Sequence, residues 1–335
     1  MKELARRADP RALFDEEGAL PASSVGFARS SLGPVRIRGH RLRKKRWDYW
    51  CVTSPTCAVA FVVADVDYLG LAAVTHFDFA SRTMTERASV LPLGRGAHLA
   101  DDFDEGAWHA SPGLSVRMVG GASGTALSAH GSAPWAKTID ARVHVAPPDE
   151  TLNVAVPFRG GGFQINAKHA ARRAAGEVRV GGRAYPLGPS AFAAYYGGRR
   201  VWPWRTRWNW ACVSGELDGR TVGINLGGAW TDGSGATENG ITVGGKLHVI
   251  GEDLVWTYDR GDFTRPWRIV APTSQAVDLV ATPFWHLHRG GSAGVLGSEL
   301  DFVWARFEGT VRTSDGETLR VPGWTGWAEQ HVARW

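Results

Sequence analysis

Acidic residues with acid–base potential occur at two places in the chain. Glu238 and Asn239 follow the Gly-rich segment TDGSGAT and begin a predicted strand. Neighbouring strand positions face opposite sides, so only one of the two side chains can point into an enclosed space. An inward glutamate among aromatic side chains would lose its hydration, which raises its pKa and suits it to donate a proton. The alternative is a glutamate at a barrel rim, paired with an arginine.

Asp65 and Asp67 form the second acidic place, in the segment ADVDYLG. Their spacing of two residues would put both carboxylates on one face of a strand. Such neighbours raise the pKa of one carboxyl, and with a third ligand they could hold a divalent cation. The alternative is a solvent-facing pair with arginine partners. We predict Glu238 as the catalytic acid, with Asp65 or Asp67 as alternatives.

The 16 tryptophans are the strongest compositional signal. Trp202 and Trp208 lie in a dense cluster, and we expect them to form the walls of a ligand cavity. Aromatic faces attract cations through the ring quadrupole, so such walls suit chemistry that passes through a carbocation. Arg199 would hold an anionic group, and Asn225 and Asn239 would supply polar ligand contacts. The alternatives are that the rings form barrel core, or that they are platforms for a sugar.

Other motifs give no support for a metal, a cofactor or a disulfide. His286 and His288 could share a metal on one strand face, but no third ligand is evident beyond Glu299 or Asp301. The sequence has no P-loop, HExxH motif or dinucleotide-binding fingerprint. Its three cysteines are an odd number without a CxxC motif, which is typical of reduced, buried thiols. We therefore predict neither metal nor cofactor.

Charge and hydropathy disfavour two classes of partner. The net charge of +5 is mild for a nucleic-acid-binding protein, and the one dense basic run, at 41–46, is typical of a solvated strand edge. No stretch approaches the ~18 apolar residues of a membrane helix, and the charged N-terminus does not resemble a signal peptide. The sequence predicts a cytoplasmic protein without nucleic-acid or integral membrane contact, whose partner is an apolar small molecule. It leaves the oligomeric state open.

Short strands must position these side chains. Gly accounts for 42 of 335 residues, and many turns with many aromatics favour antiparallel strands. Gly181-Gly182, Gly244-Gly245 and Asp315-Gly316 are predicted hairpin turns. Weak helical patterns occur at 2–8 and 167–175. The strongest strand signals lie at 57–66, 71–80, 114–119, 142–146, 152–158, 177–180, 221–226, 239–243, 246–250, 254–258, 300–307 and 317–321.

The chain contains two ordered internal echoes. The segment RWDYWCVT at 46–53 matches RWNWACVS at 207–214, a separation of 161 residues. The segment GEVRVGG starting at Gly176 matches GTVRTSDG starting at Gly309, a separation of 133. Two echoes in the same order indicate a duplication. The first copy would carry about 28 extra residues, part of them in the polar stretch 94–113.

Antiparallel closure removes the exposed edges that so many short strands would create. We therefore predict an all-β fold of two tandem antiparallel β-barrels from an internal duplication, with few short helices. The boundaries are an N-terminal extension at 1–30, a first barrel at 31–190 and a second barrel at 198–335, with a linker near 188–200.

Several segments resemble the domain-of-unknown-function 2804 family. They are WPWRTRWNW at 202–210, INLGGAWTDGSGATENGI at 224–241, GKLH at 245–248, and RWDYWC with ADVDYLGLA in the first half. The resemblance covers roughly residues 30–335. It implies lipocalin-like barrels of the calycin group, whose distant relatives include carotenoid hydratases and tocopherol cyclases, and it implies an apolar ligand. One departure is Tyr196 in YGGRR, where the family pattern DWGRG has an acid.

Three functional hypotheses follow. The first is a cofactor-independent hydratase, cyclase or isomerase that protonates an isoprenoid, polyketide or lipid-like substrate. The second is a non-catalytic carrier of such a ligand, which needs an apolar pocket but no acid. The third is a carbohydrate-active protein, which would show paired carboxylates in an open cleft.

Overall fold

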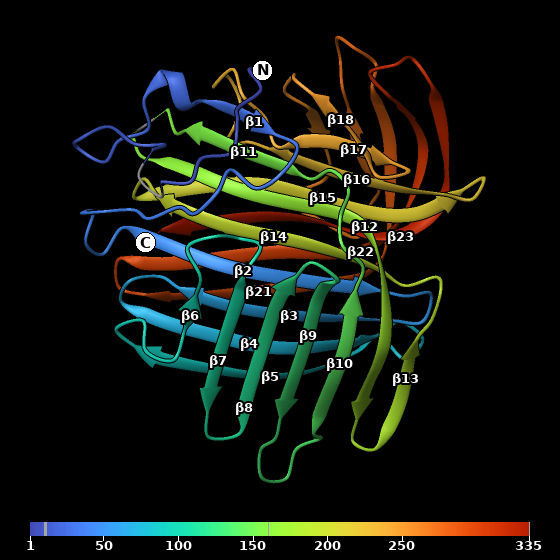
Figure 1. The fold of residues 1–335 in the computed structure, drawn as a ribbon. Coiled ribbons are helices and arrows are strands. Elements are labelled where there is room, and N and C mark those ends of the chain that lie inside the picture. The colour runs from blue at the N-terminus through green and yellow to red at the C-terminus, as the bar shows by residue number, and fades with distance from the viewer. Residues whose placement is uncertain (10–11, 160, 335) are drawn as a thin grey trace.

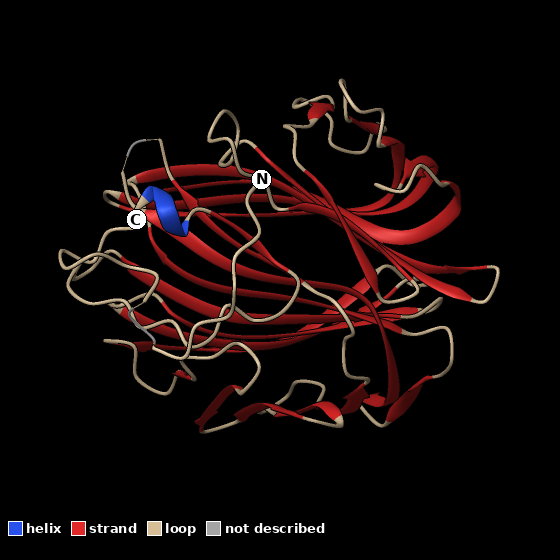
Figure 2. Cartoon of the chain, turned by 45° about the horizontal axis from the view of Figure 1, so that its top comes forward, coloured by secondary structure: helices blue, strands red, loops and turns tan. Residues whose placement is uncertain are grey.

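Strands form nearly all of the regular structure in the computed structural model, which describes residues 1–9, 12–159 and 161–334 (Figure 2). Within these residues the single helix is the short 3-10 helix η1, Ala22–Ser24. The helices expected at 2–8 and 167–175 are therefore wrong. The second of these segments lies inside a long strand, β12, between strand neighbours on both sides. Tertiary pairing there overrides the helical preference of its alanines.

The first sheet contains fourteen strands, in the order β5-β4-β3-β2-β14-β12-β10-β9-β8-β7-β6, with β1, β11 and β13 beside this path (Figure 1). Its strands are β1 (Gly26–Ala28), β2 (Lys44–Thr53), β3 (Cys57–Asp65), β4 (Leu69–Asp78), β5 (Thr83–Pro92), β6 (His98–Leu99), β7 (Gly106–Ser111), β8 (Leu114–Gly121), β9 (Gly124–Gly131), β10 (Ile139–Val145), β11 (Leu152–Pro157), β12 (Phe163–Val180), β13 (Arg183–Leu187) and β14 (Phe192–Val201).

The second sheet contains nine strands, in the order β18-β17-β16-β15-β23-β22-β21-β20-β19. Its strands are β15 (Arg205–Leu217), β16 (Arg220–Gly228), β17 (Asn239–Val243), β18 (Lys246–Ile250), β19 (Val255–Thr257), β20 (Trp267–Val270), β21 (Val277–Ala293), β22 (Leu296–Arg312) and β23 (Thr318–Arg334). Every segment with a strong strand signal falls on one of these strands.

The two strand orders match position by position, as a duplication requires. In each half, the strand with the repeated Trp motif (β2 or β15) pairs with the next strand in sequence and with the last strand of its half. The first half adds the hairpin β6–β7, inside the stretch 94–113 expected to hold an insertion, and it adds β1, β11 and β13 beside the path. The curled sheets confirm the expected all-β fold with two lipocalin-like barrels.

Gly176 and Gly309 are equivalent residues of the two halves and share the same backbone environment. They lie in β12 and β22 with φ of +149° and +134°. A Cβ atom at either position would lie 2.1 Å from the carbonyl oxygen of a neighbouring strand, that of Arg142 or Asp278. Only glycine fits this backbone conformation and this close approach.

The boundary between the halves differs from the expected one. β14 is buried throughout and belongs to the first sheet, so this sheet continues to Val201, and the expected linker at 188–200 is mostly strand. The N-terminal 30 residues are part of the first half. β1 pairs with β11, and Leu4 and Leu13 join the first hydrophobic core.

Each half has a hydrophobic core of its own, and aromatic residues from both halves fill the interface between them. We call this interface the seam. Its centre contains Tyr196, Trp210, Trp304 and Trp327. Among the described residues, no helix combines the length and apolar character needed to cross a bilayer.

Candidate functional site

The repeated Trp motif places its residues alternately on the seam and inside the barrels. In β2, Trp47 and Tyr49 face the seam, whereas Trp50 belongs to the first barrel core. In β15, Trp208 and Trp210 face the seam in the same way. Because side chains alternate along a strand, each copy of the duplicated motif places aromatic rings on the seam, one set from each half.

A cavity of about 430 Å³ lies in this seam, with walls from both halves. We call it the seam cavity. Trp47, Trp202, Trp208 and Phe302 supply aromatic wall, and β3, β4 and β5 supply mostly alanine, valine and leucine. The volume is typical of small-molecule sites, which span about 300–1,000 Å³. Of the predicted ligand-binding residues, Trp202 and Trp208 line this cavity.

Glu329 is a carboxyl group in this apolar wall. It lies in β23, is 8% exposed and accepts a hydrogen bond of 2.9 Å from the indole Nε1 of Trp208. Burial raises the pKa of Glu329 to about 7, and the nearby Glu238 adds to this, while the Trp208 bond and the charge of Lys168 oppose it. A carboxyl with a pKa near neutrality can both donate and accept a proton.

Two neighbours of Glu329 on the cavity wall are His331 and Tyr196. Burial lowers the pKa of His331 to about 4, so its imidazole is neutral near pH 7. Its ring packs against that of Trp208 at a tilt of 47°, and its Nε2 contacts Ser298 Oγ at 2.7 Å. Tyr196 is buried, and desolvation raises its pKa above the ordinary value of a phenol. Of these three side chains, Glu329 is therefore the one whose protonation changes near neutral pH.

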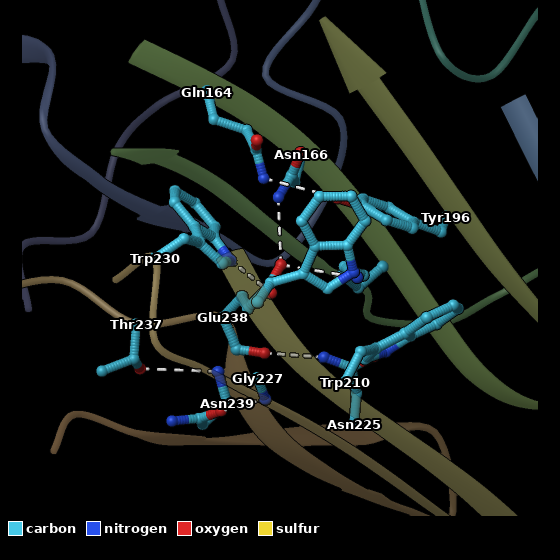
Figure 3. A network of polar contacts seen from close by, with 12 residues as sticks. Gln164, Asn166, Tyr196, Trp210, Asn225, Gly227, Trp230, Thr237, Glu238 and Asn239 are labelled. Atoms are coloured by element: carbon cyan, nitrogen blue, oxygen red, sulfur yellow. Dashed lines mark hydrogen bonds and ion pairs between the residues drawn. The ribbon is translucent and has the colours of Figure 1, made fainter. Parts of the chain in front are cut away.

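Glu238, the predicted acid, is 1% exposed and lies beside the seam but does not line the cavity. Figure 3 shows its carboxylate held by side chains of both halves. Trp230 Nε1 donates to Oε1 at 2.7 Å, Asn166 Nδ2 donates to Oε2 at 3.0 Å, and Lys168 Nζ lies 3.4 Å from Oε2. Both oxygens are occupied by these donors, so Glu238 has the environment of a structural ion-pair partner.

Lys168 connects this network to the cavity wall. Its ammonium lies 3.2 Å from the ring centroid of Tyr196 and 4.1 Å from that of Trp210. Burial lowers the pKa of Lys168 to about 8, against the charges of Glu238 and Glu329, which raise it. The cation is still mostly protonated at pH 7, and aromatic faces favour it there.

Asn225 and Asn239 hold the second-half strands around Glu238. Asn225 Nδ2 donates to the Glu238 backbone carbonyl at 2.6 Å, and its Oδ1 accepts from Trp210 Nε1 at 2.8 Å. Asn239 Oδ1 accepts from the Gly227 amide (Figure 3). Neither residue lines the seam cavity.

Arg199, the predicted anion anchor, points into the first barrel. It is fully buried and forms an ion pair of 2.8 Å with Asp48, which is also fully buried. It also donates to the backbone carbonyl of Ala100 at 2.9 Å.

Asp65 and Asp67 lie at the β3–β4 turn. β3 ends at Asp65, so the strand alternation that would align the two carboxylates does not extend to Asp67, which has a φ of +77°. Asp65 pairs with Arg46 at 3.1 Å and accepts a bond from the Asp67 amide. Neither lines the seam cavity. The contacts of Asp65 and Asp67 are those that stabilise the β3–β4 turn.

Glu86 and Arg289 line the seam cavity from opposite halves. Arg289 Nη2 lies 2.9 Å from Glu86 Oε2, and their side chains are 46% and 25% exposed. This ion pair joins β5 to β21 at the solvent-facing side of the cavity.

The position of Glu329 mirrors that of Tyr196. Tyr196 pairs with Tyr49 across β14 and β2, and Glu329 pairs with Trp210 across β23 and β15. Tyr49 and Trp210 are equivalent residues of the duplicated motif, and Tyr196 and Glu329 are separated by the same 133 residues as Gly176 and Gly309. Sequence reasoning missed Glu329, although this repeat spacing and the alternation of Trp327, Glu329 and His331 pointed to it.

The described part of the chain contains no group of three or more His, Cys, Asp or Glu residues placed to hold a metal ion. His286 Nε2 and His288 Nδ1 both contact Asp301 Oδ1, at 3.0 and 2.9 Å. The three cysteines are buried and unbonded, as their number and spacing suggested.

Comparison with known proteins agrees with this architecture. The model of the family described as domain of unknown function (DUF2804) matches residues 4–335, so the chain belongs to this family. No curated protein matches the sequence. The crystal structure of CghA with Sch210972 is similar over 88% of this chain and 89% of that chain, with a TM-score of 0.53 and 10% identity. Kievitone hydratase from Nectria haematococca matches over 99% and 97% of the two chains, with a TM-score of 0.45 and 9% identity. At 10% identity the likeness to CghA concerns the fold alone.

Proposed function

We propose that this member of the DUF2804 family binds an apolar small molecule in the seam cavity and exchanges a proton with it through Glu329. The observation that carries the proposal is a buried carboxyl, with a pKa raised to about 7, in a wall built of tryptophan and aliphatic side chains. The apolar lining selects an apolar or amphipathic ligand of isoprenoid, polyketide or similar type. The acid supplies chemistry that a plain carrier does not need.

Proton transfer to a carbon–carbon double bond fits this site. Protonated Glu329 gives its proton to one carbon and becomes a carboxylate, and the other carbon becomes cationic. The faces of Trp47 and Trp208 stabilise that cation. Loss of a different proton to the Glu329 carboxylate completes an isomerisation. In a cyclisation an internal double bond first attacks the cation, and the new cation then loses a proton to Glu329. In a hydration water adds to the cation, and the resulting oxonium gives its extra proton to Glu329. Glu329 is protonated again at the end of each sequence, so the residue is a catalyst.

Two features favour Glu329 over Glu238 as the acid. Glu329 lines the cavity, and its carboxyl group accepts a hydrogen bond from Trp208. Glu238 does not line it, and both its oxygens accept N–H groups or contact Lys168. We therefore assign Glu238 to the contact between the halves and retain Trp202 and Trp208 as ligand contacts.

The carbohydrate alternative is less well supported. A sugar site presents several polar groups and an accessible pair of carboxylates. The seam cavity is lined mostly by apolar side chains, and its two glutamates, Glu86 and Glu329, lie in different settings: one in an exposed ion pair and one buried.

The test begins with the ligand. Native mass spectrometry of the protein purified from its own host identifies a retained small molecule. That molecule is then incubated with the protein in D₂O, and deuterium incorporation is followed by mass spectrometry. Glu329→Gln keeps the shape of the side chain and removes the proton, whereas Glu86→Gln is a matched control at the same cavity.

The expected result is incorporation by the unmodified protein and by Glu86→Gln, and loss of incorporation in Glu329→Gln with binding retained. Equal incorporation by Glu329→Gln would exclude it as the acid. Binding without incorporation by any of the three proteins would leave the carrier hypothesis in place of the enzyme.

A further inference from the structure

A second cavity, of about 370 Å³, lies in the first half and shares no lining residue with the seam cavity. We call it the first-barrel cavity. Trp50 and Phe103, both from the first hydrophobic core, and Pro148 form apolar wall. Five of its lining residues are buried and polar: Ser31, Thr125, Thr151, His169 and Arg172. A polar group of this kind inside a barrel core is costly unless it has a partner.

Arg172 is the dominant polar group. It is 6% exposed, and no Asp or Glu of the described chain lies within ion-pair distance of its guanidinium. Its Nε donates to the Ala146 carbonyl at 2.8 Å, Nη1 donates to His169 Nδ1 at 3.1 Å, and Nη2 donates to Thr125 Oγ1 at 3.4 Å. A guanidinium has five N–H groups, so two are left after these three bonds.

The neighbours of Arg172 also have protons to donate. A guanidinium cannot accept a hydrogen bond, so His169 Nδ1 is the acceptor and the ring proton is on Nε2. Burial and the charge of Arg172 hold the pKa of His169 well below its ordinary value, which keeps the ring neutral. Thr125 and Thr151 accept from Arg172 and Asn153, and each keeps its hydroxyl proton. The buried lining is thus rich in donors and poor in acceptors.

The charges around the first-barrel cavity also favour an acceptor-rich, negatively charged group at its inner end. Asp104 and Asp149 line it and are exposed. Asp104 lies 3.8 Å from Arg6, and its side chain is 56% exposed, so solvent and Arg6 weaken its field. Burial lowers the pKa of Arg172 to about 10, and the residue is charged at neutral pH. The inner part of the cavity is positive and the rim is negative, which excludes a buried cation as the occupant.

We propose that the first-barrel cavity binds a small amphipathic anion, a carboxylate or similar oxyanion with an apolar body. The unused N–H groups of Arg172 and the hydroxyls of Thr125 and Thr151 take its oxygens. Trp50 and Phe103 take its apolar part. This site is independent of the proposed chemistry in the seam cavity.

The probe is sodium octanoate below its micellar concentration, with 1-octanol and octylammonium as charge controls of the same length. Binding is measured by titration calorimetry on the full-length protein. The variants are Arg172→Met, which removes the guanidinium, and Arg173→Gln as the matched control. Arg173 is the next residue, and it pairs with Glu216 on the surface. Glu329→Gln and Trp208→Ala report on binding in the seam cavity.

The expected result is saturable binding of octanoate, with at least tenfold weaker binding of octanol and octylammonium. Arg172→Met should weaken octanoate binding by at least tenfold, and Arg173→Gln, Glu329→Gln and Trp208→Ala should leave it unchanged. Asp104→Asn removes a negative charge at the rim and should strengthen binding a few-fold, a gain that a merely unfolded variant cannot give. If Arg172→Met is unfolded by circular dichroism, Thr125→Val and Asp104→Asn decide the matter.

Three outcomes would overturn the proposal. One is the absence of saturable octanoate binding to the unmodified protein. Another is binding by a folded Arg172→Met variant that equals that of the unmodified protein. The third is loss of binding in Trp208→Ala with retention in Arg172→Met, which would place octanoate in the seam cavity.

Discussion

Tyr196 and Glu329 occupy equivalent positions in the two halves and line the same cavity from opposite sides of the duplication. Each is in the last strand of its half, directly across from Tyr49 or Trp210 of the repeated motif. One half presents a phenol whose pKa is raised by burial above its ordinary value, and the other presents a carboxyl with a pKa near 7. The two positions have equivalent backbone places but different chemistry: of the two side chains, Glu329 is the one that can donate a proton near neutral pH.

The raised pKa of Glu329 predicts a pH-dependent stability. Below pH 4.5, the ordinary value, the carboxyl is protonated in folded and unfolded protein alike; between 4.5 and about 7 only the folded protein holds the proton. The free energy of unfolding should therefore fall by about 3 kcal/mol over this window relative to Glu329→Gln, which lacks the group. Urea unfolding of both proteins at several pH values measures the difference. A difference that does not vary between pH 4.5 and 7 would contradict the raised pKa.

Trp208→Phe should raise the pKa of Glu329 further. The indole N–H stabilises the carboxylate, and phenylalanine keeps a ring but offers no donor. Carbon-13 NMR of labelled glutamate carboxyls follows the titration, with the Glu329→Gln spectrum identifying the signal. Trp202→Phe is the control, since Trp202 lines the same cavity but donates to Gln164. An unchanged midpoint in Trp208→Phe would show that the bond does not stabilise the charged form.

Asp48→Ala should destabilise the protein by about 3–5 kcal/mol, because it leaves the Arg199 cation buried without its counter-ion. Thermal and denaturant unfolding measure this loss. Glu216→Ala is the control: it removes a carboxylate from a half-exposed pair with Arg173 and should leave the transition almost unchanged. Similar small losses in both variants would mean that Arg199 finds water or another partner.

Gly309→Ala should cost about 2–3 kcal/mol, from the φ of +134° together with the contact between the new Cβ and the Asp278 carbonyl. Gly291→Ala is the matched control in the adjacent strand β21, where a Cβ atom would meet nothing within 4 Å. The melting temperatures of the two variants are compared with that of the unmodified protein, and we expect a clear decrease in Gly309→Ala alone. Equal melting temperatures would show that β22 can relax around the added methyl group.

The sequence predicted the architecture better than the chemistry. The duplicated barrel could be predicted because it leaves local sequence patterns, namely the echoes at 46–53 and 207–214 and the glycine turns. Two of these turns, Gly181-Gly182 and Gly244-Gly245, have the positive φ values expected of hairpin turns. The run 167–175 misled because its alanines favour a helix in isolation, whereas strands on both sides of β12 fix it as extended. Such pairing is long-range and leaves no trace in a nine-residue window.

The site was only half predictable for the same reason. Trp202 and Trp208 stand out by residue type, and both line the seam cavity. Glu238 and Arg199 also stand out, but their partners, Lys168 and Asp48, come from distant strands, and these partners determine that they form buried ion pairs. Glu329 carries no local motif of its own. Its environment comes from Trp208, which is 121 residues away.

The separate cores of the two barrels have a consequence for cooperativity. Each half encloses its own core, and the cavity lies between the halves. A ligand in the cavity therefore makes apolar contacts with both halves at once and stabilises their association. A ligand that enters beside the exposed contact of Arg289 with Glu86 needs neither barrel to unfold. Without the ligand the halves should melt with weaker coupling, and with it they should melt as one unit.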